Sequence, residues 1–370
     1  MKVPLIDLGA QQREVADEVR AGLDAVFGAT AFVGGPDVAA FEADYAAETG
    51  VAHCIGVANG TDALELALRA VGVTPDGEVI LPANTFIATA EAVSRIGARP
   101  VLVDVDPEHL LIDPARVAEA ITARTQAVVP VHLFGQVAPV EDLAEIVVPA
   151  GIPIVEDAAQ SQGATRHGRV SGSLGIVAAT SFYPGKNLGA AGDAGGVTTD
   201  DASIAEHVRI LATHGSPTKY VHDVVGMNSR LDTVQAVVLR AKLKRLPGWN
   251  EGRRKAAERY DAMLSSVPGV TLPGTAPGNL HAWHLYVVQV DERDAVLESL
   301  HVAGVGAGVH YPTPVHLTGA YAHLGLGRGS FPVAEAAADR ILSLPMFPHI
   351  TSDQQEHVVT SLDAALNGLA

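Results

Sequence analysis

Between residues 50 and 200, short and almost continuous apolar runs alternate with helical patterns and with stretches rich in glycine and proline. Nearly unbroken apolar runs are typical of strands that are buried on both faces of a parallel sheet. Between two of these runs, the segment Asp62–Val71 places its apolar residues on one helical face. The predicted strands are Ala52–Val57, Glu78–Leu81, Pro100–Val105, Gln126–Val131, Ile152–Glu156, Val177–Phe182 and Gly195–Thr199. This alternation predicts a doubly wound α/β sheet.

The pattern changes after the predicted sheet. A long helix is predicted over Leu231–Leu246, and Pro247-Gly248 is predicted to end it. The elements predicted beyond it are a helix over Glu251–Leu264, a strand over His284–Val290 and a helix over Arg293–Ala303. We therefore expect two domains, a large α/β domain over residues 1–248 and a smaller α+β domain over residues 249–370.

Charge and cysteine content narrow the class of protein. The 370-residue chain has 42 Asp and Glu against 25 Lys and Arg, and its net charge of −17 repels nucleic acids and anionic membranes. The single cysteine, Cys54, excludes a disulfide framework, and the histidine spacing fits no metal motif. No apolar run is long enough for a membrane helix, and Asp7 interrupts the N-terminal segment before a secretory signal could form. We expect a cytoplasmic protein without a nucleic-acid, membrane or metal partner.

Lysine is scarce in the first half of the chain, where Lys186 is the only one between Lys2 and Lys219. It follows a predicted strand, in the stretch SFYPGKNLG over residues 181–189. A lysine in a turn at the end of a buried strand can be partly desolvated, which lowers its pKa and frees the amine for imine chemistry. Taken alone, the pattern fits an ordinary loop lysine even better.

Three other stretches also follow predicted strands and carry groups that can bind a ligand. Asp157 and Gln160 lie in IVEDAAQ, where the carboxylate could pair with a cationic ring nitrogen, a metal or a ribose, or simply cap a helix. Gly60 lies in a turn that opens a helix, and such a turn either binds a phosphate or serves only as scaffold. Phe86 could lie flat on an aromatic cofactor or pack in the core.

Together, the four features describe one ligand more specifically than any of them does alone. That ligand has a phosphate, an aromatic ring with a basic nitrogen, and a carbonyl that a lysine can capture. Pyridoxal 5′-phosphate has all three groups, and a carboxylate beside its ring nitrogen keeps that nitrogen protonated, so that the ring can accept electrons. The sequence therefore predicts a pyridoxal phosphate enzyme.

Several motifs resemble the DegT/DnrJ/EryC1/StrS family of pyridoxal-phosphate-dependent nucleotide-sugar aminotransferases. The motifs are NGTDAL at 59–64, EDAAQ at 156–160, SFYPGKNLG at 181–189, GMNSRLD at 226–232, FVGG at 32–35 and HYPTPVHL at 310–317. They cover essentially the whole chain in the family's order. The resemblance implies the fold-type I architecture, a mostly parallel seven-stranded sheet flanked by helices, with a smaller C-terminal α+β domain.

The resemblance also implies roles for the residues around the cofactor. Lys186 would bind the cofactor's aldehyde carbon through its amine and then carry the proton between cofactor and sugar. Asp157 would hold the pyridine nitrogen, Gln160 would contact the ring hydroxyl, and Phe86 would stack on the ring. The phosphate would be held by Gly60, Thr61, Asp62 and Ser181.

Other matching positions imply a homodimer and a substrate site. Asn228 would reach the phosphate of the neighbouring subunit's cofactor, so that the active sites are shared across the interface. The residues that match stretches bordering the substrate are Tyr183, Asn187, Arg230, His310, Tyr311 and His316.

The resemblance implies amino transfer from L-glutamate to a dTDP-linked keto-6-deoxyhexose, which gives a dTDP-amino-6-deoxyhexose. In the first half of the reaction the cofactor would take the amino group, giving its pyridoxamine form and 2-oxoglutarate. In the second half it would pass the amino group to the sugar. The stretches VHLFGQ at 131–136 and KYVH at 219–222 favour amination at C3 over C4. Relatives that act as dehydratases replace the lysine with histidine, so Lys186 argues for transamination. A dehydratase or lyase, and a cofactor-binding regulator without turnover, are the alternatives.

Overall fold

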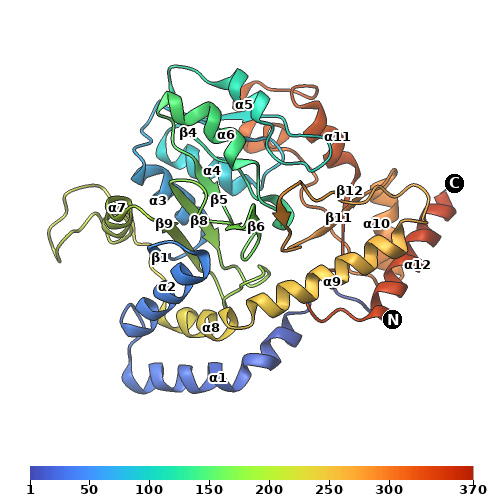
Figure 1. Ribbon diagram of the computed structural model, residues 1–370, viewed down its shortest axis with the longest axis horizontal. Coiled ribbons are helices and arrows are strands. Elements are labelled where there is room, and N and C mark those ends of the chain that lie inside the picture. Colours follow the sequence, from blue (N-terminus) through green and yellow to red (C-terminus); the bar gives the residue numbers. More distant parts are fainter. Residues whose placement is uncertain (370) are drawn as a thin grey trace.

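The computed structural model describes residues 1–369, and within them seven strands form one twisted sheet (Figure 1). Its strands, in spatial order, are β1 (His53–Val57), β9 (Gly195–Thr199), β8 (Val177–Ser181), β5 (Val155–Asp157), β4 (Thr125–Val128), β2 (Glu78–Pro82) and β3 (Arg99–Val103). Parallel bridges from Val128 to Ile154 and from Val131 to Asp157 join the two halves. Only β9 runs antiparallel to its neighbours within this sheet. The predicted mostly parallel seven-stranded sheet is confirmed.

Helices flank the sheet because their apolar faces are buried against it. The helix α3 (Gly60–Ala70) packs against β8 and β9, and its residues 62–68 are all buried. Asp and Asn side chains cap several of these helices, as Asn59 does for α3 by accepting a hydrogen bond from Asp62 N at 2.8 Å. The other helices of this part are α1 (Leu8–Ala29), α2 (Pro36–Thr49), α4 (Ile87–Ile96), α5 (Pro114–Ala120), α6 (Val140–Val147), α7 (Ala202–Ala212) and α8 (Thr233–Leu243).

A second apolar core lies toward the C-terminus. It is built around the antiparallel pair β11 (Tyr286–Gln289) and β12 (Ile341–Leu344) and the helices packed beside it. These helices are α9 (Leu246–Leu264), α10 (Arg293–Val302) and α12 (Ser352–Leu369), whereas α11 (Pro332–Arg340) buries Ala334 and Ala337 in the core of the large sheet. The short strands β6 (Thr165–Arg166), β7 (Arg169–Val170) and β10 (Asn279–Leu280) form a separate small sheet. The expected fold-type I architecture includes a smaller C-terminal α+β part of this kind.

The predicted helix break at Pro247-Gly248 is wrong. Helix α8 ends at Leu243, and α9 begins at Leu246, with Pro247 in its first turn. Proline is tolerated there because the first N–H groups of a helix have no intrahelical acceptor. Helix α9 therefore crosses residue 248, where we expect the domain boundary, and Figure 1 shows it running from α8 toward α12.

Helix α9 contributes buried polar side chains to the contact between the two cores. The guanidinium group of Arg253 is fully buried, and its Nη1 donates to the carbonyl oxygens of Trp283, His284 and Met346 at 3.1, 3.3 and 3.0 Å. One turn earlier, Asn250 donates to Gln162 O at 2.9 Å. The same helix is thus bonded to loops on both sides of it.

Across residues 1–369, we find no helix with the length and apolar character that a bilayer crossing requires.

Candidate active site

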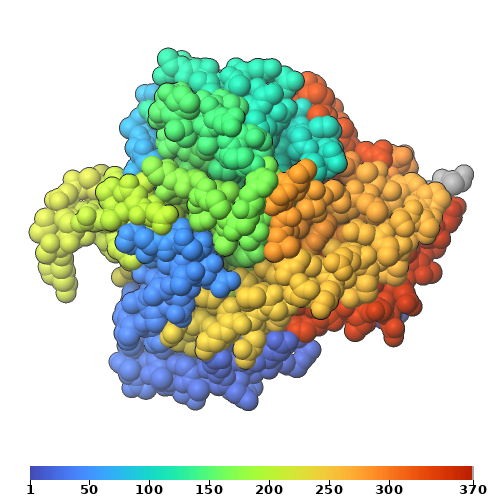
Figure 2. Space-filling model, viewed as in Figure 1, coloured from blue at the N-terminus to red at the C-terminus, as the bar shows by residue number. Residues whose placement is uncertain are grey.

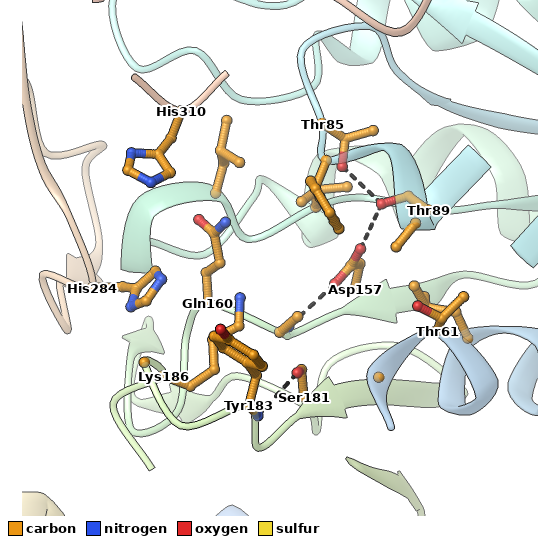
Figure 3. Close-up of a pocket in the computed structure, with 18 of the residues that line it drawn as sticks. Thr61, Thr85, Thr89, Asp157, Gln160, Ser181, Tyr183, Lys186, His284 and His310 are labelled. Atoms are coloured by element: carbon orange, nitrogen blue, oxygen red, sulfur yellow. Dashed lines mark hydrogen bonds between the residues drawn. The ribbon is translucent and has the colours of Figure 1, made fainter. Parts of the chain in front are cut away.

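A cavity of about 420 Å³ opens at the carboxyl ends of β5 and β8, between the sheet and the smaller C-terminal part (Figure 3). Ligands of open α/β sheets collect at this edge, where loops from several strands converge. Ten of the predicted site residues line it: Gly60, Thr61, Phe86, Asp157, Gln160, Ser181, Tyr183, Lys186, His310 and Tyr311. Motifs that are up to 251 positions apart in the sequence therefore meet around one space.

Lys186 follows β8 in a tight turn, in which its own N–H donates to Tyr183 O at 2.9 Å. The loop is compact, since a Cβ atom on Gly189 would lie 2.3 Å from Pro184 O. Burial lowers the pKa of the Lys186 amine to about 8, although the charge of Asp157 opposes the shift. At neutral pH more of this lysine is a free amine than in an exposed side chain, as imine chemistry requires.

Asp157, at the end of β5, presents a buried carboxylate to the cavity. Its Oδ2 accepts a hydrogen bond from Thr89 Oγ1 at 2.7 Å, and Thr89 is in turn 2.7 Å from Thr85 Oγ1. Burial raises the pKa of Asp157, against the opposing effects of Thr89, the Ala159 N–H and Lys186. A cation bound beside this carboxylate would remove the cost of its burial. The protonated ring nitrogen of pyridoxal phosphate is such a cation.

The amino end of α3 and Ser181 form a cradle for an anion. The first two N–H groups of the helix, at Gly60 and Thr61, have no intrahelical acceptor and carry the positive end of the helix dipole. A Cβ atom on Gly60 would lie 2.6 Å from the Cβ of Ser181, so only glycine permits this close approach. The cradle, the amine and the carboxylate together fit the phosphate, the aldehyde and the ring nitrogen of pyridoxal phosphate.

Substituting Gly60 with alanine is expected to narrow this cradle. The added methyl group meets Ser181, and overpacking of this kind costs about 1–3 kcal/mol, or roughly tenfold to a hundredfold in cofactor affinity. Titration of the apoprotein with pyridoxal phosphate, followed by visible absorption, measures the change. Gly28→Ala is the matched control, because Gly28 has nothing within 4 Å of its would-be Cβ. Unchanged affinity in the Gly60 variant would show that the phosphate binds elsewhere.

An aromatic pair and a glutamine complete the cavity wall. The rings of Phe86 and Tyr311 lie 5.1 Å apart with an interplanar angle of 39°. Gln160 accepts a hydrogen bond from Phe134 N at 2.8 Å and donates to Tyr311 Oη at 2.9 Å. This fixes the amide of Gln160 and ties the sheet side of the cavity to the C-terminal side. Half of the Phe86 side chain is exposed, which leaves its ring free to cover a flat ligand.

Three predicted site residues point away from the cavity. The Asp62 carboxylate bonds Arg95 at 3.3 Å, and its N–H is already capped by Asn59, so it does not join the cradle. Asn187 is buried, and its Nδ2 donates to Asn250 Oδ1 and to the Ala282 carbonyl, both at 2.8 Å. His316 is buried 3.0 Å from Glu335 and belongs to the packing around α11. None of the three lines the cavity, and their expected contacts with cofactor or substrate stay predictions.

Asn228 and Arg230 are also outside the cavity, on the exposed segment between α7 and α8. Asn228 forms an isolated antiparallel bridge with Thr213. The N–H groups of Met227 and Ser229 donate to carbonyls at the end of α7, at 2.8 and 2.9 Å. The two side chains are therefore held at the surface, where they cannot serve the cavity of their own chain.

Two chemically important residues of the cavity were not predicted as site residues, Thr89 and His284. Thr89 lies inside a helix that gives no signal in the sequence beyond its place after a strand. His284 was expected to begin a strand over His284–Val290. The strand begins only at Tyr286, and Trp283 has a left-handed backbone with φ of 47°, so the chain turns there and brings His284 to the cavity.

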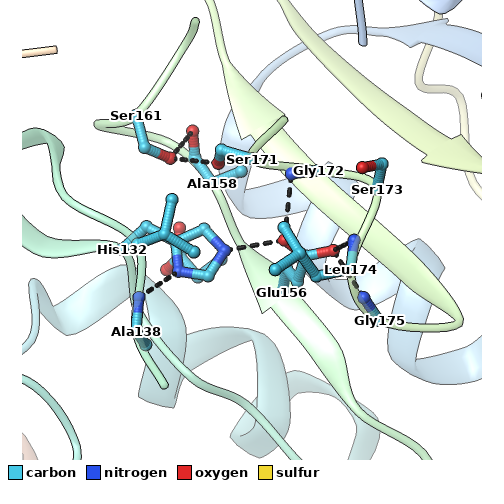
Figure 4. A network of polar contacts seen from close by, with 12 residues as sticks. His132, Ala138, Glu156, Ala158, Ser161, Ser171, Gly172, Ser173, Leu174 and Gly175 are labelled. Carbon is cyan, nitrogen blue, oxygen red and sulfur yellow. Dashed lines mark hydrogen bonds and ion pairs between the residues drawn. The ribbon is translucent and has the colours of Figure 1, made fainter. Parts of the chain in front are cut away.

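A buried hydrogen bond between His132 and Glu156 anchors the strand end that carries Asp157 (Figure 4). Glu156 Oε2 lies 2.7 Å from His132 Nε2, and the carboxylate also accepts three N–H groups from the loop 172–175. The Ala138 N–H donates to His132 Nδ1 at 3.1 Å, so the imidazole proton lies on Nε2 and points to Glu156. Although burial acts to raise the pKa of Glu156, these bonds keep it below its usual value. The adjacent Asp157 is held in place as a result.

The sheet and the amine, carboxylate and phosphate sites around this cavity define a fold-type I pyridoxal phosphate enzyme. The sequence model of the DegT/DnrJ/EryC1/StrS aminotransferase family matches residues 13–363. The chain belongs to this family, and the predicted cofactor and aminotransferase class are confirmed with it.

The similarity extends over whole chains. The erythromycin biosynthesis sensory transduction protein EryC1 of Saccharopolyspora erythraea is 48% identical over 98% of this chain and 100% of its own length. A dTDP-3-amino-3,4,6-trideoxy-alpha-D-glucose transaminase of Streptomyces venezuelae is 44% identical, over 98% of this chain and 95% of its own. The structure of S. venezuelae DesV in complex with a ketimine intermediate superposes with a TM-score of 0.96, at 44% identity and 98% coverage of both chains. Another solved relative is NtdA of Bacillus subtilis with bound cofactor PMP. It is 30% identical to this chain and superposes with a TM-score of 0.91, over 99% of this chain and 85% of its own.

Proposed function

We propose that this enzyme transfers the amino group of L-glutamate to C3 of a dTDP-linked keto-6-deoxyhexose. The observation that carries amino transfer is the position of Lys186, a lysine with a lowered pKa that shares one cavity with the Asp157 carboxylate and the Gly60–Ser181 cradle. The sugar class and the choice of C3 are supported by the named activity of the S. venezuelae relative. The 48% identical relative, in contrast, is named as a sensory transduction protein, which keeps the regulator alternative in view.

Each residue of the cavity has a part in this reaction. Pyridoxal phosphate supplies an aldehyde that bonds amines and a ring that accepts electrons. Asp157 would keep the ring nitrogen protonated, and the cradle would hold the phosphate, so that the ring is fixed at both ends. Lys186 would first hold the aldehyde carbon and, once displaced, take a proton from one carbon and return it to the next. Phe86 would cover the ring and exclude water from one face.

The experiment that tests this function offers the enzyme two acceptors separately. The purified protein is incubated with pyridoxal phosphate, L-glutamate and either dTDP-3-keto- or dTDP-4-keto-6-deoxyglucose, and the products are identified by mass spectrometry and NMR. We expect an aminosugar, with stoichiometric 2-oxoglutarate, from the 3-keto sugar. Product from the 4-keto sugar alone would move the reaction to C4. Loss of water without 2-oxoglutarate would support a dehydratase, and cofactor binding without any product would support a regulator.

A homodimer with shared active sites is the assembly that we propose. The segment 214–230, which we call the arm, projects beyond α7 at the left of Figure 2. Its apolar side chains Tyr220 and Val225 are 82% and 85% exposed, which favours burial against another copy of the chain. The base of the arm holds Asn228 at the surface through the contacts with α7. From there Asn228 would reach the phosphate of the partner's cofactor.

Mixing two defective variants tests this shared site. Lys186→Ala and Asn228→Ala are combined after mild denaturation and refolding, so that hybrid dimers form. A hybrid contains one intact site only if Lys186 and Asn228 of different subunits act together. Because about half of the dimers in an equal mixture are hybrids, and each has one intact site of two, we then expect about a quarter of wild-type activity. The unmixed variants, treated in the same way, are the controls. Activity no higher than the average of these controls would contradict sharing.

A further inference from the structure

The C-terminal wall of the cavity carries an imidazole, His284, that the reaction described above does not use. Its side chain is 6% exposed and lines the same cavity as Lys186 (Figure 3). Lys186 is the only Lys or Arg among the residues that line this cavity. Within the described part of the chain, its Nζ has no hydrogen-bond partner in the protein. A cation without a hydrogen-bond partner and an imidazole therefore share one space.

Two buried amides determine which nitrogen of His284 carries the proton. Asn250 Nδ2 donates to the Gln162 carbonyl at 2.9 Å, so its Oδ1 faces Asn187. Asn187 Nδ2 donates to that oxygen and to the Ala282 carbonyl, both at 2.8 Å. Both amides are thus oriented by backbone carbonyl oxygens, which can only accept hydrogen bonds.

The remaining oxygen, Asn187 Oδ1, lies 3.2 Å from His284 Nδ1. Because this oxygen is an acceptor, the imidazole proton must be on Nδ1. Burial, together with the charge of Lys186, lowers the pKa of His284 well below its usual value, so the ring is neutral. The other nitrogen, Nε2, is then a lone-pair acceptor. It makes no hydrogen bond within residues 1–369, and it is not among the fully buried, unpaired atoms there, which leaves it open to the cavity.

We propose that Nε2 of His284 accepts a hydrogen bond from the Lys186 ammonium group whenever the displaced lysine holds a proton. The lysine amine takes that proton from one carbon and gives it up to the next, and His284 lends a lone pair without taking the proton. Asn187 and Asn250 are then positioning residues that act through His284. This inference rests on the proposed role of Lys186 as the proton carrier.

Besides Lys186 and His284, the titratable groups that line the same cavity are Asp157, Tyr183, Asp193, His310 and Tyr311.

The test measures the pKa of Lys186 in the apoprotein, where its amine is free. Trace labelling with acetic anhydride across pH, followed by mass spectrometry of the labelled peptide, gives this pKa without any turnover. His284→Asn keeps an N–H donor for Asn187 but has no acceptor at the position of Nε2. Since an acceptor favours the ammonium form, we expect the pKa of Lys186 to fall by about one unit in this variant. His284→Gln can place its Oε1 near the position of Nε2, and we expect it to restore most of the shift.

The matched control is His281→Asn. His281 is 4% exposed and lies three residues earlier, but it lines a different cavity, beside Trp283. We expect no change in the pKa of Lys186 from this substitution. An unshifted lysine in His284→Asn, or an equal shift in the His281 control, would overturn the proposal.

Kinetics of the loaded enzyme provide a second readout. Loss of lysine positioning in His284→Asn is expected to lower kcat about tenfold with KM nearly unchanged. A raised KM with unchanged kcat and an unshifted lysine would assign His284 to substrate binding and overturn the proposal. Should neither keto sugar be aminated, the proposed function fails, but the labelling of Lys186 still decides whether His284 contacts it.

Discussion

Lys186→Ala is expected to abolish amino transfer, with a loss on the order of 10⁴-fold or more, because both nucleophilic attachment and proton transfer depend on one amine. The burial that lowers the pKa of Lys186 to about 8 supplies this amine at neutral pH, and none of the other residues lining the cavity is a lysine. Steady-state rates with L-glutamate and the keto sugar measure the loss. The visible absorption of the lysine-bound cofactor is expected to disappear with it.

Two comparisons separate chemistry from folding in this experiment. Lys255→Ala removes an exposed lysine of α9 that pairs with Glu251, and we expect wild-type rates from it. Adding methylamine to Lys186→Ala offers a small amine to the emptied space and is expected to restore part of the activity. Substantial turnover by Lys186→Ala without added amine would mean that another base carries the proton.

Asp157→Asn is expected to reduce activity strongly while leaving the shape of the site almost unchanged. The carboxylate is buried and would face the cationic ring nitrogen, and loss of one member of a buried ion pair costs about 3–5 kcal/mol. Converted to a rate, this cost is roughly 10²- to 10³-fold in kcat. The exposed Asp142→Asn in α6 is the matched control, and we expect it to leave kcat unchanged.

The same substitution is expected to act in the opposite direction on the apoprotein. Burial raises the pKa of Asp157 above its unfolded value, so its ionisation costs stability at any pH above the unfolded pKa. Asparagine removes that cost, and we expect the melting temperature of the apoprotein at pH 7 to rise rather than fall. A lower melting temperature together with intact catalysis would show that Asp157 serves only the packing of β5.

The sheet and most of the cavity could be predicted because their signals are local. Each buried strand is a nearly continuous apolar run, and β9 was predicted with the bounds that the structure gives it. Residues directly after parallel strands meet at one edge of the sheet, which is why Gly60, Asp157 and Lys186 converge although 126 positions separate the first from the last.

The direction of a side chain could not be predicted where it depends on contacts that are distant in sequence. Lys186 and Asn187 are neighbours in one loop, but Asn187 turns away because Asn250 of α9 and the Ala282 carbonyl bind its amide. His284 reaches the cavity because the backbone of Trp283 is left-handed, which strand periodicity cannot reveal. The role that we propose for the arm depends on a second copy of the chain, which a single sequence read in isolation does not describe.

The course of α9 has a consequence for how the molecule unfolds. Near its start, Asn250 is bonded to the lysine loop, and one turn later Arg253 is bonded to three carbonyls of the C-terminal part. Separating the two cores would strip the partners from a buried guanidinium group and from two buried amides, and groups of this kind are costly to leave unpaired. We therefore expect the two cores to melt in one cooperative transition, with the catalytic lysine loop losing its order at the same temperature as the helix that spans both.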